Sequence, residues 1–164
     1  MTVAAVLDAN VLYPIALADF FITTAGLGSY RAHWSPQILD EVRRNLAANR
    51  PDLSSDQIAF RLAAMERAMP SAAVEPHLEL IDQMTNDPED RHVLATAVVA
   101  EAGFVVTFNT RDFPAAACAA QDVVAESPDA FAVEIIDHLS LRLPEAMRQL
   151  RAALPAGESE EHES

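Results

Sequence analysis

Residues 87–113, DPEDRHVLATAVVAEAGFVVTFNTRDF, indicate the fold class more clearly than any other stretch of the chain. Asp87 followed by a proline is a typical helix start, so we predict a helix from there to Ala102. Gly103 should end this helix, and residues 104–107 form an apolar run typical of a buried strand. A helix that leads directly into a strand is the repeating unit of α/β proteins.

The rest of the chain repeats this alternation. Apolar runs predict strands, a weak one at 73–74 included, and capping residues and helical periodicity predict the helices between them. The predicted strands are 3–7, 30–34, 73–74, 104–107 and 123–125. The predicted helices are 13–25, one that begins at Ser35-Pro36, one from Ser54 to about 69, a short one from Phe113-Pro114, 127–139 and 144–154. We therefore expect an α/β three-layer sandwich in which helices flank a central parallel sheet.

Length and composition favour one soluble domain. The chain has 164 residues, of which 51% are apolar, which is enough for a buried core. No apolar run approaches the roughly 18 residues of a membrane span, and the N-terminus lacks the basic start of a signal peptide. The single cysteine, Cys118, excludes an internal disulfide. These features predict a cytoplasmic protein that does not contact a membrane.

The net charge of −14 limits the kinds of partner. Only 11 residues are basic, and all are arginine. Such acidity argues against a broad electrostatic footprint on nucleic acid, and it fits a protein that binds cations or a basic partner. Residues 155–164 hold four glutamates and no basic residue, so we expect an acidic, disordered tail there.

Several acidic and amide side chains fall where open α/β sheets bind ligands, at the carboxyl ends of strands. Asp8 ends the first predicted strand, and Asn109 and Asp112 follow the strand that ends at residue 107. Asp90 lies in the first turn of the preceding helix, and Glu41 lies on the helix that begins at Ser35. Hard cations such as Mg²⁺ bind carboxylate oxygens, so these residues are candidates for a metal site.

Each acid also has a purely structural explanation. Asp8 suits a turn after a strand, and Glu41 suits a solvated helix face. Asp90 could complete a capping box with Asp87, and Asp112 could cap the turn before the next helix. Considered alone, each acid is better explained by its structural role. Considered together in their local contexts, the four acids favour a metal site.

Four motifs resemble those of PIN domains. VLDANVL at 6–12 is similar to the first strand of that family, and SPQILDEV at 35–42 to its second motif, with Glu41 as the acid. DRHVLATA at 90–97 resembles the third motif, and VVTFNTRDF at 105–113 the fourth. The order and spacing agree with the family from residue 3 to about 132.

The resemblance implies a five-stranded parallel sheet and hydrolysis of phosphodiester bonds with Mg²⁺ or Mn²⁺. In its size and its single domain, the chain looks most like the VapC-type toxin of a toxin–antitoxin pair. Such a toxin is an endoribonuclease that acts on RNA, is held inactive by its cognate antitoxin and can form a homodimer. The expected nuclease domain covers 1–154, with its core at 3–132 and an extra C-terminal helix at about 144–154. The stretch 46–83 is long for the smallest members, and we expect an extra helix there over one rim of the site.

The resemblance also assigns roles. Asp8 and Asp90 are expected to hold the principal metal ion, and Glu41 and Asp112 to complete its coordination directly or through waters. Asn10 and Thr107 should orient carboxylates or a water. Asn109 stands where many members have Asp, which leaves Asp112 as the fourth carboxylate.

Three residues that flank the motifs are candidates for contact with the RNA backbone. They are Arg91, His92 and Arg111. An ordinary surface role explains them equally well.

Two other functions fit parts of the pattern. A Mg²⁺-dependent phosphatase of the haloacid-dehalogenase type would need a second Asp where the chain has Asn10, and a lysine, which the chain lacks. A catalytically inactive PIN-like interaction module is the other alternative, although all four carboxylates are present.

Overall fold

The computed structural model describes residues 3–153, with the side chains of 140–151 and 153 left aside, and its centre is a parallel sheet. The strand order is β2-β1-β3-β4, and each neighbouring pair is parallel. The strands are β1 (Ala4–Leu7), β2 (Arg31–His33), β3 (Phe104–Val106) and β4 (Val124–Glu126). The predicted α/β class is confirmed. The sheet has four strands instead of five, because the expected strand at 73–74 is reduced to one bridge between Ala73 and Trp34.

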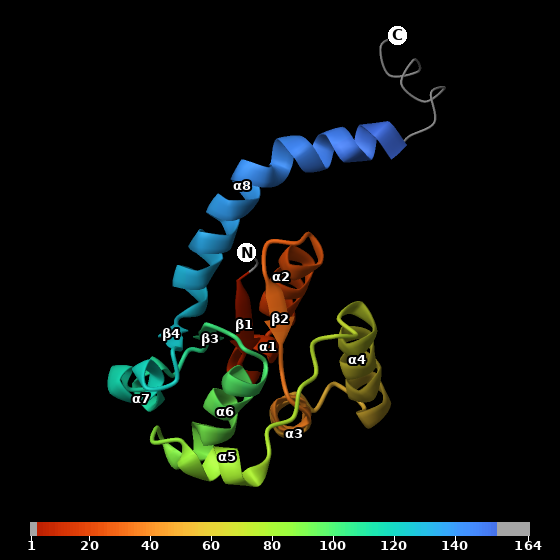
Figure 1. The fold of residues 1–164 in the computed structure, drawn as a ribbon. Coiled ribbons are helices and arrows are strands. Elements are labelled where there is room, and N and C mark those ends of the chain that lie inside the picture. Colours follow the sequence, from red (N-terminus) through yellow and green to blue (C-terminus); the bar gives the residue numbers. More distant parts are fainter. Residues whose placement is uncertain (1–2, 154–164) are drawn as a thin grey trace.

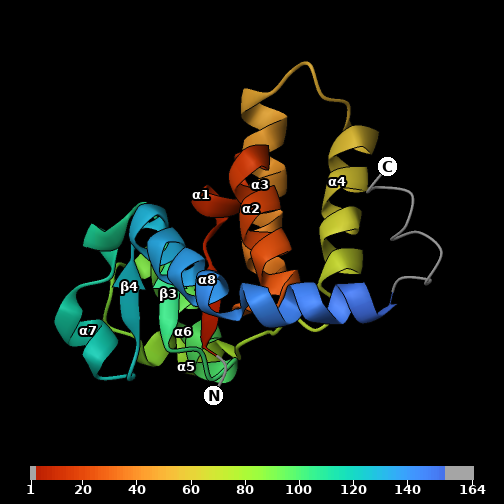
Figure 2. The ribbon, with the colours of Figure 1, turned by 90° about the horizontal axis from the view of Figure 1, so that it is seen from above.

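Helices flank both faces of this sheet. In Figures 1 and 2, α2 and the first turns of α8 lie on one side of it, and α5 and α6 lie on the other. The helices are α1 (Ala9–Leu12), α2 (Ile15–Gly26), α3 (Pro36–Asn49), α4 (Ser55–Ala68), α5 (Leu78–Gln83), α6 (Arg91–Val99), α7 (Ala115–Ala119) and α8 (Pro128–Ala153). Two 3-10 turns, η1 (Pro88–Asp90) and η2 (Thr110–Asp112), precede α6 and α7.

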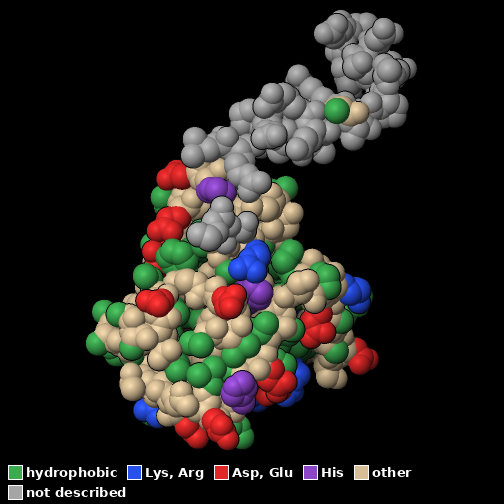
Figure 3. All heavy atoms as spheres, viewed as in Figure 1, with side chains coloured by type: hydrophobic (Ala, Val, Ile, Leu, Met, Phe, Trp, Pro, Cys, Tyr) green, Lys and Arg blue, Asp and Glu red, His purple; other side chains and the backbone are tan. Residues whose placement is uncertain are grey.

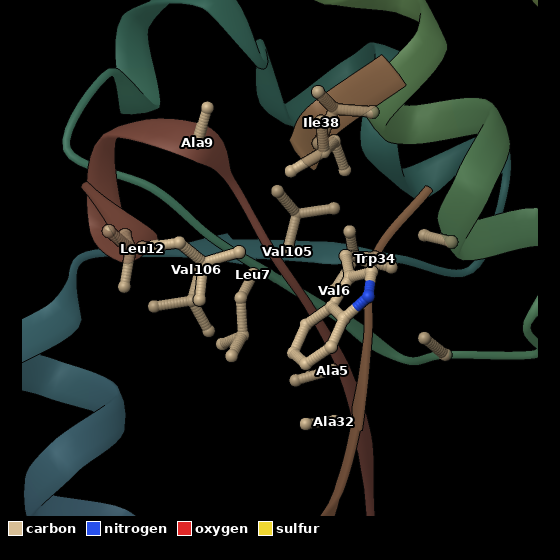
Figure 4. Close-up of a cluster of buried hydrophobic side chains, with 14 of the residues drawn as sticks. Ala5, Val6, Leu7, Ala9, Leu12, Ala32, Trp34, Ile38, Val105 and Val106 are labelled. Carbon is tan, nitrogen blue, oxygen red and sulfur yellow. The ribbon is translucent and has the colours of Figure 1, made fainter. Parts of the chain in front are cut away.

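The core lies where β1 and β3 meet the helices. Every residue of β1 is buried, which explains why this strand reads as a continuous apolar run. Figure 4 shows side chains of β1 and β3 packed with Leu12 of α1, Trp34 and Ile38 of α3, all of which belong to one buried cluster. The carboxyl end of β1 is therefore held rigidly.

An aromatic cluster fixes the first turns of α8 on the face of the sheet that also carries α2. The ring centroid of Phe131 lies 5.2 Å from that of Tyr30, 5.5 Å from Phe104 of β3 and 6.3 Å from Phe21 of α2. Such contacts contribute about 1 kcal/mol per pair beyond the burial of area. These contacts join α8, the last helix, to α2 near the beginning of the chain.

The helix starts predicted at Ser35 and Ser54 are confirmed, whereas the helix expected from Asp87 begins at Arg91, after the 3-10 turn η1. The Ser35 hydroxyl accepts a hydrogen bond from the backbone N–H of Ile38 at 3.1 Å. Ser54 and Gln57 form both bonds of a capping box, at 2.8 and 3.1 Å. These signals are reliable because each cap is satisfied within four residues of chain.

The predicted end of the helix before β3 was wrong. The helix expected to reach Ala102 ends at Val99, and Glu101 turns the chain with a left-handed φ of 54°. The backbone N–H of Ala102 then donates to the carbonyl of Ala97, which is how such helix ends satisfy their last carbonyls. Gly103, the expected stop, comes after this turn and begins the approach to β3.

The C-terminal region also differs from the prediction. Helices were expected at 127–139 and 144–154, but α8 continues without a break from Pro128 to Ala153. Figure 1 shows that α8 bends part-way along its length. Leu154 and the acidic segment 155–164 lie outside the described residues.

Within the described part of the chain, no helix combines the length and the apolar character that crossing a bilayer requires.

Candidate metal centre

Asp8 and Thr107 meet at the carboxyl edge of the sheet. Leu7 of β1 pairs with Val106 of β3, so the next residue of each strand lies side by side. The Thr107 hydroxyl donates to Asp8 Oδ2 at 2.9 Å, and the backbone N–H of Ala9 donates to Asp8 Oδ1 at 2.7 Å. Asp8 is 3% exposed, and burial raises the pKa of its carboxyl despite these hydrogen bonds.

The Asn10 side chain and the backbone N–H of Asn109 hold Thr107 in this position. Asn10 Nδ2 donates to the Thr107 hydroxyl at 3.3 Å, and Asn10 Oδ1 accepts from the N–H of Phe108 at 3.2 Å. The backbone N–H of Asn109 also donates to the Thr107 hydroxyl, at 3.0 Å. The hydroxyl therefore accepts two bonds and directs its proton to Asp8, which fixes the carboxylate's orientation.

Glu41 reaches the same region from α3. Its Oε1 lies 2.9 Å from Nε2 of His92, which is the second residue of α6. The contact has the distance of an ion pair but not the direction of a hydrogen bond, since both ring nitrogens of His92 are buried without such a bond among the described residues. Glu41 is close enough to Asp8 for its charge to raise the pKa of Asp8, while His92 lowers it.

Asp90 is a second acid of the group whose pKa is raised. Burial, a side-chain hydrogen bond to Asp112 and the charges of Asp8, Asp112 and Asp87 raise the pKa of Asp90 to about 7. The backbone also connects the two segments, because the N–H of Asp87 donates to the carbonyl of Asp112 at 3.1 Å. The structure thus brings Asp8, Asp90 and Asp112 into one region, which Glu41 reaches from α3.

Asp87 has the capping role predicted for it. Its Oδ1 accepts from the N–H of Glu89 at 3.0 Å and opens the turn η1. The expected capping box with Asp90 does not form, because the Asp90 side chain makes no capping bond and interacts with Asp112 instead. The two aspartates of the DPED segment therefore separate into a structural and a site residue.

A polar cavity of about 690 Å³ lies over these carboxylates. Its floor includes Glu41, Asp90, Asn109 and Asp112, and α5 forms one rim, as expected for an extra helix in the stretch 46–83. The lining residues that were not predicted include Gln37, Arg44 and Asn45 of α3. A helical spacing of four residues from Glu41 in each direction points to Gln37 and Asn45, and this signal was available in the sequence.

The three candidates for RNA contact have different environments. Arg91 donates from Nε to the carbonyl of Asn86 at 2.9 Å and is partly buried, while Arg111 is exposed. His92 is 3% exposed, both of its ring nitrogens are enclosed, and it contacts Glu41; its contact with RNA stays a prediction. On the face shown in Figure 3, the described arginines are scattered and form no continuous basic track.

The carboxylates suit a hard cation, although they do not form a complete ligand set. Within residues 3–153, no three side chains of His, Cys, Asp or Glu are arranged to hold a metal ion together. Mg²⁺, however, commonly binds one or two carboxylates and keeps several waters. Asp112 lies close enough to Asp90 to raise the pKa of Asp90, and a cation beside them would offset this repulsion.

Comparisons with known proteins identify the family. No curated protein matches the chain. A chain in the solved structure of FitAB bound to an IR36 DNA fragment is similar, with a TM-score of 0.50 and 19% identity over 76% of this chain and 94% of that chain, a likeness that shows the fold alone. A family model described as PIN domain matches residues 4–111, more than half of the chain, and ends one residue before Asp112. The chain therefore belongs to the PIN domain family.

Proposed function

We propose that this protein is an endoribonuclease that hydrolyses RNA phosphodiester bonds with Mg²⁺ or Mn²⁺, and that it is the toxin of a toxin–antitoxin pair. The observation that carries the proposal is Asp90, whose pKa is raised to about 7 by burial and by the carboxyls of Asp112, Asp8 and Asp87 beside an open polar cavity. PIN domains are typically nucleases, and carboxylates forced together are what cation-dependent phosphodiester hydrolysis requires.

The side chains divide the work. Asp90 and Asp112 would hold the cation, with Asp8 and Glu41 contributing directly or through waters. The chemistry that the cation supplies is neutralisation of charge on the scissile phosphate and a lower pKa for the attacking water. Thr107, held by Asn10, keeps the Asp8 carboxylate turned in one direction, as partners of ligands commonly do.

RNA binding is localised in this proposal. Arg44 lines the cavity, and the exposed Arg111 adjoins Asp112, so both are placed to contact phosphates next to the scissile bond. The Arg44 Nε also donates a hydrogen bond to Asp40 at 3.0 Å. The negative charge of Asp40 partly offsets the attraction of Arg44 for a phosphate, and the bond favours one position of the Arg44 side chain. With a net charge of −14, the protein has little further attraction for a polyanion.

The same acidity suits a basic antitoxin as partner, and a homodimer remains part of the proposal. An arginine from such a partner could pair with Asp90 or Asp112 and exclude the cation. The solved structure that shares the fold contains FitAB on a DNA fragment. For this chain, we propose that the partner is itself a DNA-binding protein.

The activity is tested by incubating the protein with a generic single-stranded RNA in Mg²⁺ or Mn²⁺, with and without EDTA. We expect internal cleavage that EDTA abolishes and that leaves 5′-phosphate and 3′-hydroxyl ends. Cleavage that persists in EDTA, or its absence with every cation and RNA tried, would refute the proposal.

An inactive interaction module is the second candidate, and one observation favours it. Both Asp8 oxygens already accept hydrogen bonds, and Glu41 lies against His92, so two of the four carboxylates have partners within the protein. Binding of the antitoxin without cation-dependent cleavage would select this alternative. A phosphatase has no such support, because the chain contains no lysine.

A further inference from the structure

The polar cavity continues into a second one along the helix α5. The second cavity has a volume of about 520 Å³, and it shares Gln37, Leu78 and Ile81 with the first. Together they form one groove between α3 and α5, which begins at the carboxylates and ends beside Pro36 and His77. We call this the α3–α5 groove.

The two walls of the groove differ in chemistry. The α3 wall presents the amides of Gln37 and Asn45, both exposed, each of which can donate and accept hydrogen bonds. The α5 wall presents Leu78, which is 78% exposed, and the half-buried Ile81. No residue of α5 is fully buried, so Leu78 contributes nothing to the core and its side chain is available to a ligand.

The charges of the groove exclude binding through the RNA backbone. Among the described residues that line it, Arg44 is the single arginine, and it already pairs with Asp40. A chain with a net charge of −14 gains little from phosphate contacts away from a bound cation. Affinity for a nucleic acid along this groove has to come from contacts with bases, which are apolar on their faces and polar on their edges.

We propose that the α3–α5 groove binds unpaired nucleotides of the RNA that flank the scissile phosphate, through their bases. Leu78 and Ile81 contact the faces of the bases, and Gln37 and Asn45 hydrogen-bond their edges. The strand must be unpaired, because base faces and edges are hidden within a duplex. This inference rests on the proposed function for the position of the scissile phosphate at Asp90 and Asp112.

The test measures binding separately from cleavage. A fluorescein-labelled single-stranded RNA of 12 mixed nucleotides and the same sequence as a duplex are titrated with protein in Ca²⁺ and in EDTA, and anisotropy is recorded. We expect the single strand to bind more tightly than the duplex, with a shallow dependence on salt. Leu78→Ser and Gln37→Ala should each raise the Kd for the single strand by about five- to tenfold.

Phe60→Ser is the matched control, since Phe60 is an equally exposed apolar residue (70%) on α4, and it should leave the Kd unchanged. Equal Kd values for Leu78→Ser and wild type, equal binding of duplex and single strand, or no binding of either RNA would overturn the proposal. Circular dichroism of each variant separates loss of binding from loss of folding.

Cleavage assays keep this proposal distinguishable from the proposed function. If RNA is cleaved and the groove variants keep the wild-type KM, the groove is not the substrate's path, although the nuclease stands. If wild type cleaves no RNA but the groove variants still weaken binding of the single strand, the groove is a nucleic-acid site on an inactive domain. Groove variants that weaken binding of the protein partner alone would assign the groove to the antitoxin and overturn the proposal.

Discussion

The structure contains two clusters of acids at the carboxyl ends of neighbouring strands, and they differ in what surrounds them. Asp90 shares its site with Asp8 and Asp112, and its pKa is raised to about 7. Glu126 ends β4 and faces Glu134 of α8, and burial together with Glu134 raises the pKa of Glu126 to about 6. Both clusters hold carboxyls that repel each other when ionised.

The difference lies in the cavity and in the number of acids. Asp90 and Asp112 line an open polar cavity of about 690 Å³, into which a cation and a phosphate could enter. Glu126 and Glu134 line neither half of the α3–α5 groove and form a pair between a strand and a helix. A raised carboxyl pKa therefore marks burial together with neighbouring acids, and only the addition of space and further oxygen donors makes a candidate metal site.

The largest expected effect is on catalysis. Asp90→Asn should lower the rate of Mg²⁺-dependent RNA cleavage by about a thousandfold, because the amide removes a charge that holds the cation. Glu126→Gln should cleave at the wild-type rate. Initial rates at saturating RNA measure both. An Asp90→Asn protein as active as wild type would remove the distinction between the clusters.

The effect of a metal ion on the melting temperature should distinguish the two clusters. Mg²⁺ or Mn²⁺ at about 100 times its Kd should raise the melting temperature of wild type by about 5–10 °C, because the cation binds only the folded state. The same shift is expected for Glu126→Gln and none for Asp90→Asn. Differential scanning fluorimetry records it; a shift retained in Asp90→Asn would place the cation elsewhere.

The pH dependence of stability should distinguish the clusters further. The folded-state pKa values of Asp90 and Glu126 lie above their ordinary values of 3.8 and 4.5, so each group's contribution is greatest at low pH and is lost as pH rises to about 7 and 6. Each substitution by the amide should therefore stabilise the metal-free protein at pH 8 relative to wild type. Because both side chains retain contact with solvent, we expect about 1–2 kcal/mol.

Urea denaturation at pH 4 and pH 8 measures this difference. Adding Mg²⁺ at pH 8 should cancel the advantage of Asp90→Asn by stabilising wild type, and it should leave the advantage of Glu126→Gln intact. Equal responses of the two variants to Mg²⁺ would contradict the comparison.

The smallest effect concerns Asp87, which lies beside the site but caps η1. Asp87→Ala should lower the free energy of unfolding by about 1 kcal/mol and reduce cleavage much less than Asp90→Asn does. Chemical denaturation and initial rates on the same preparation give both quantities. If Asp87→Ala lowered the rate of cleavage as much as Asp90→Asn does, Asp87 would take part in the site.

Local sequence determined the class of fold and most of its elements. Continuous apolar runs gave β1 and β3, and Ser35 and Ser54 gave the helix starts, because these signals act within a few residues. The same reasoning failed where the end of a strand or helix depends on contacts with residues far away in the chain. The bridge at Ala73 stayed a single pair, and α8 continued past Pro144.

The candidate site shows the same division. The sequence by itself placed Asp8, Asp90 and Asp112 at strand ends and helix starts, and the family motifs grouped them with Glu41. Only the tertiary structure decided that Asp90 contacts Asp112, that His92 lies against Glu41, and that α5 forms a rim with Leu78 exposed. The reason is physical: strand and cap preferences are set by neighbours in the chain, whereas the meeting of Thr107 and Asp8, 99 residues apart, depends on strand order and register.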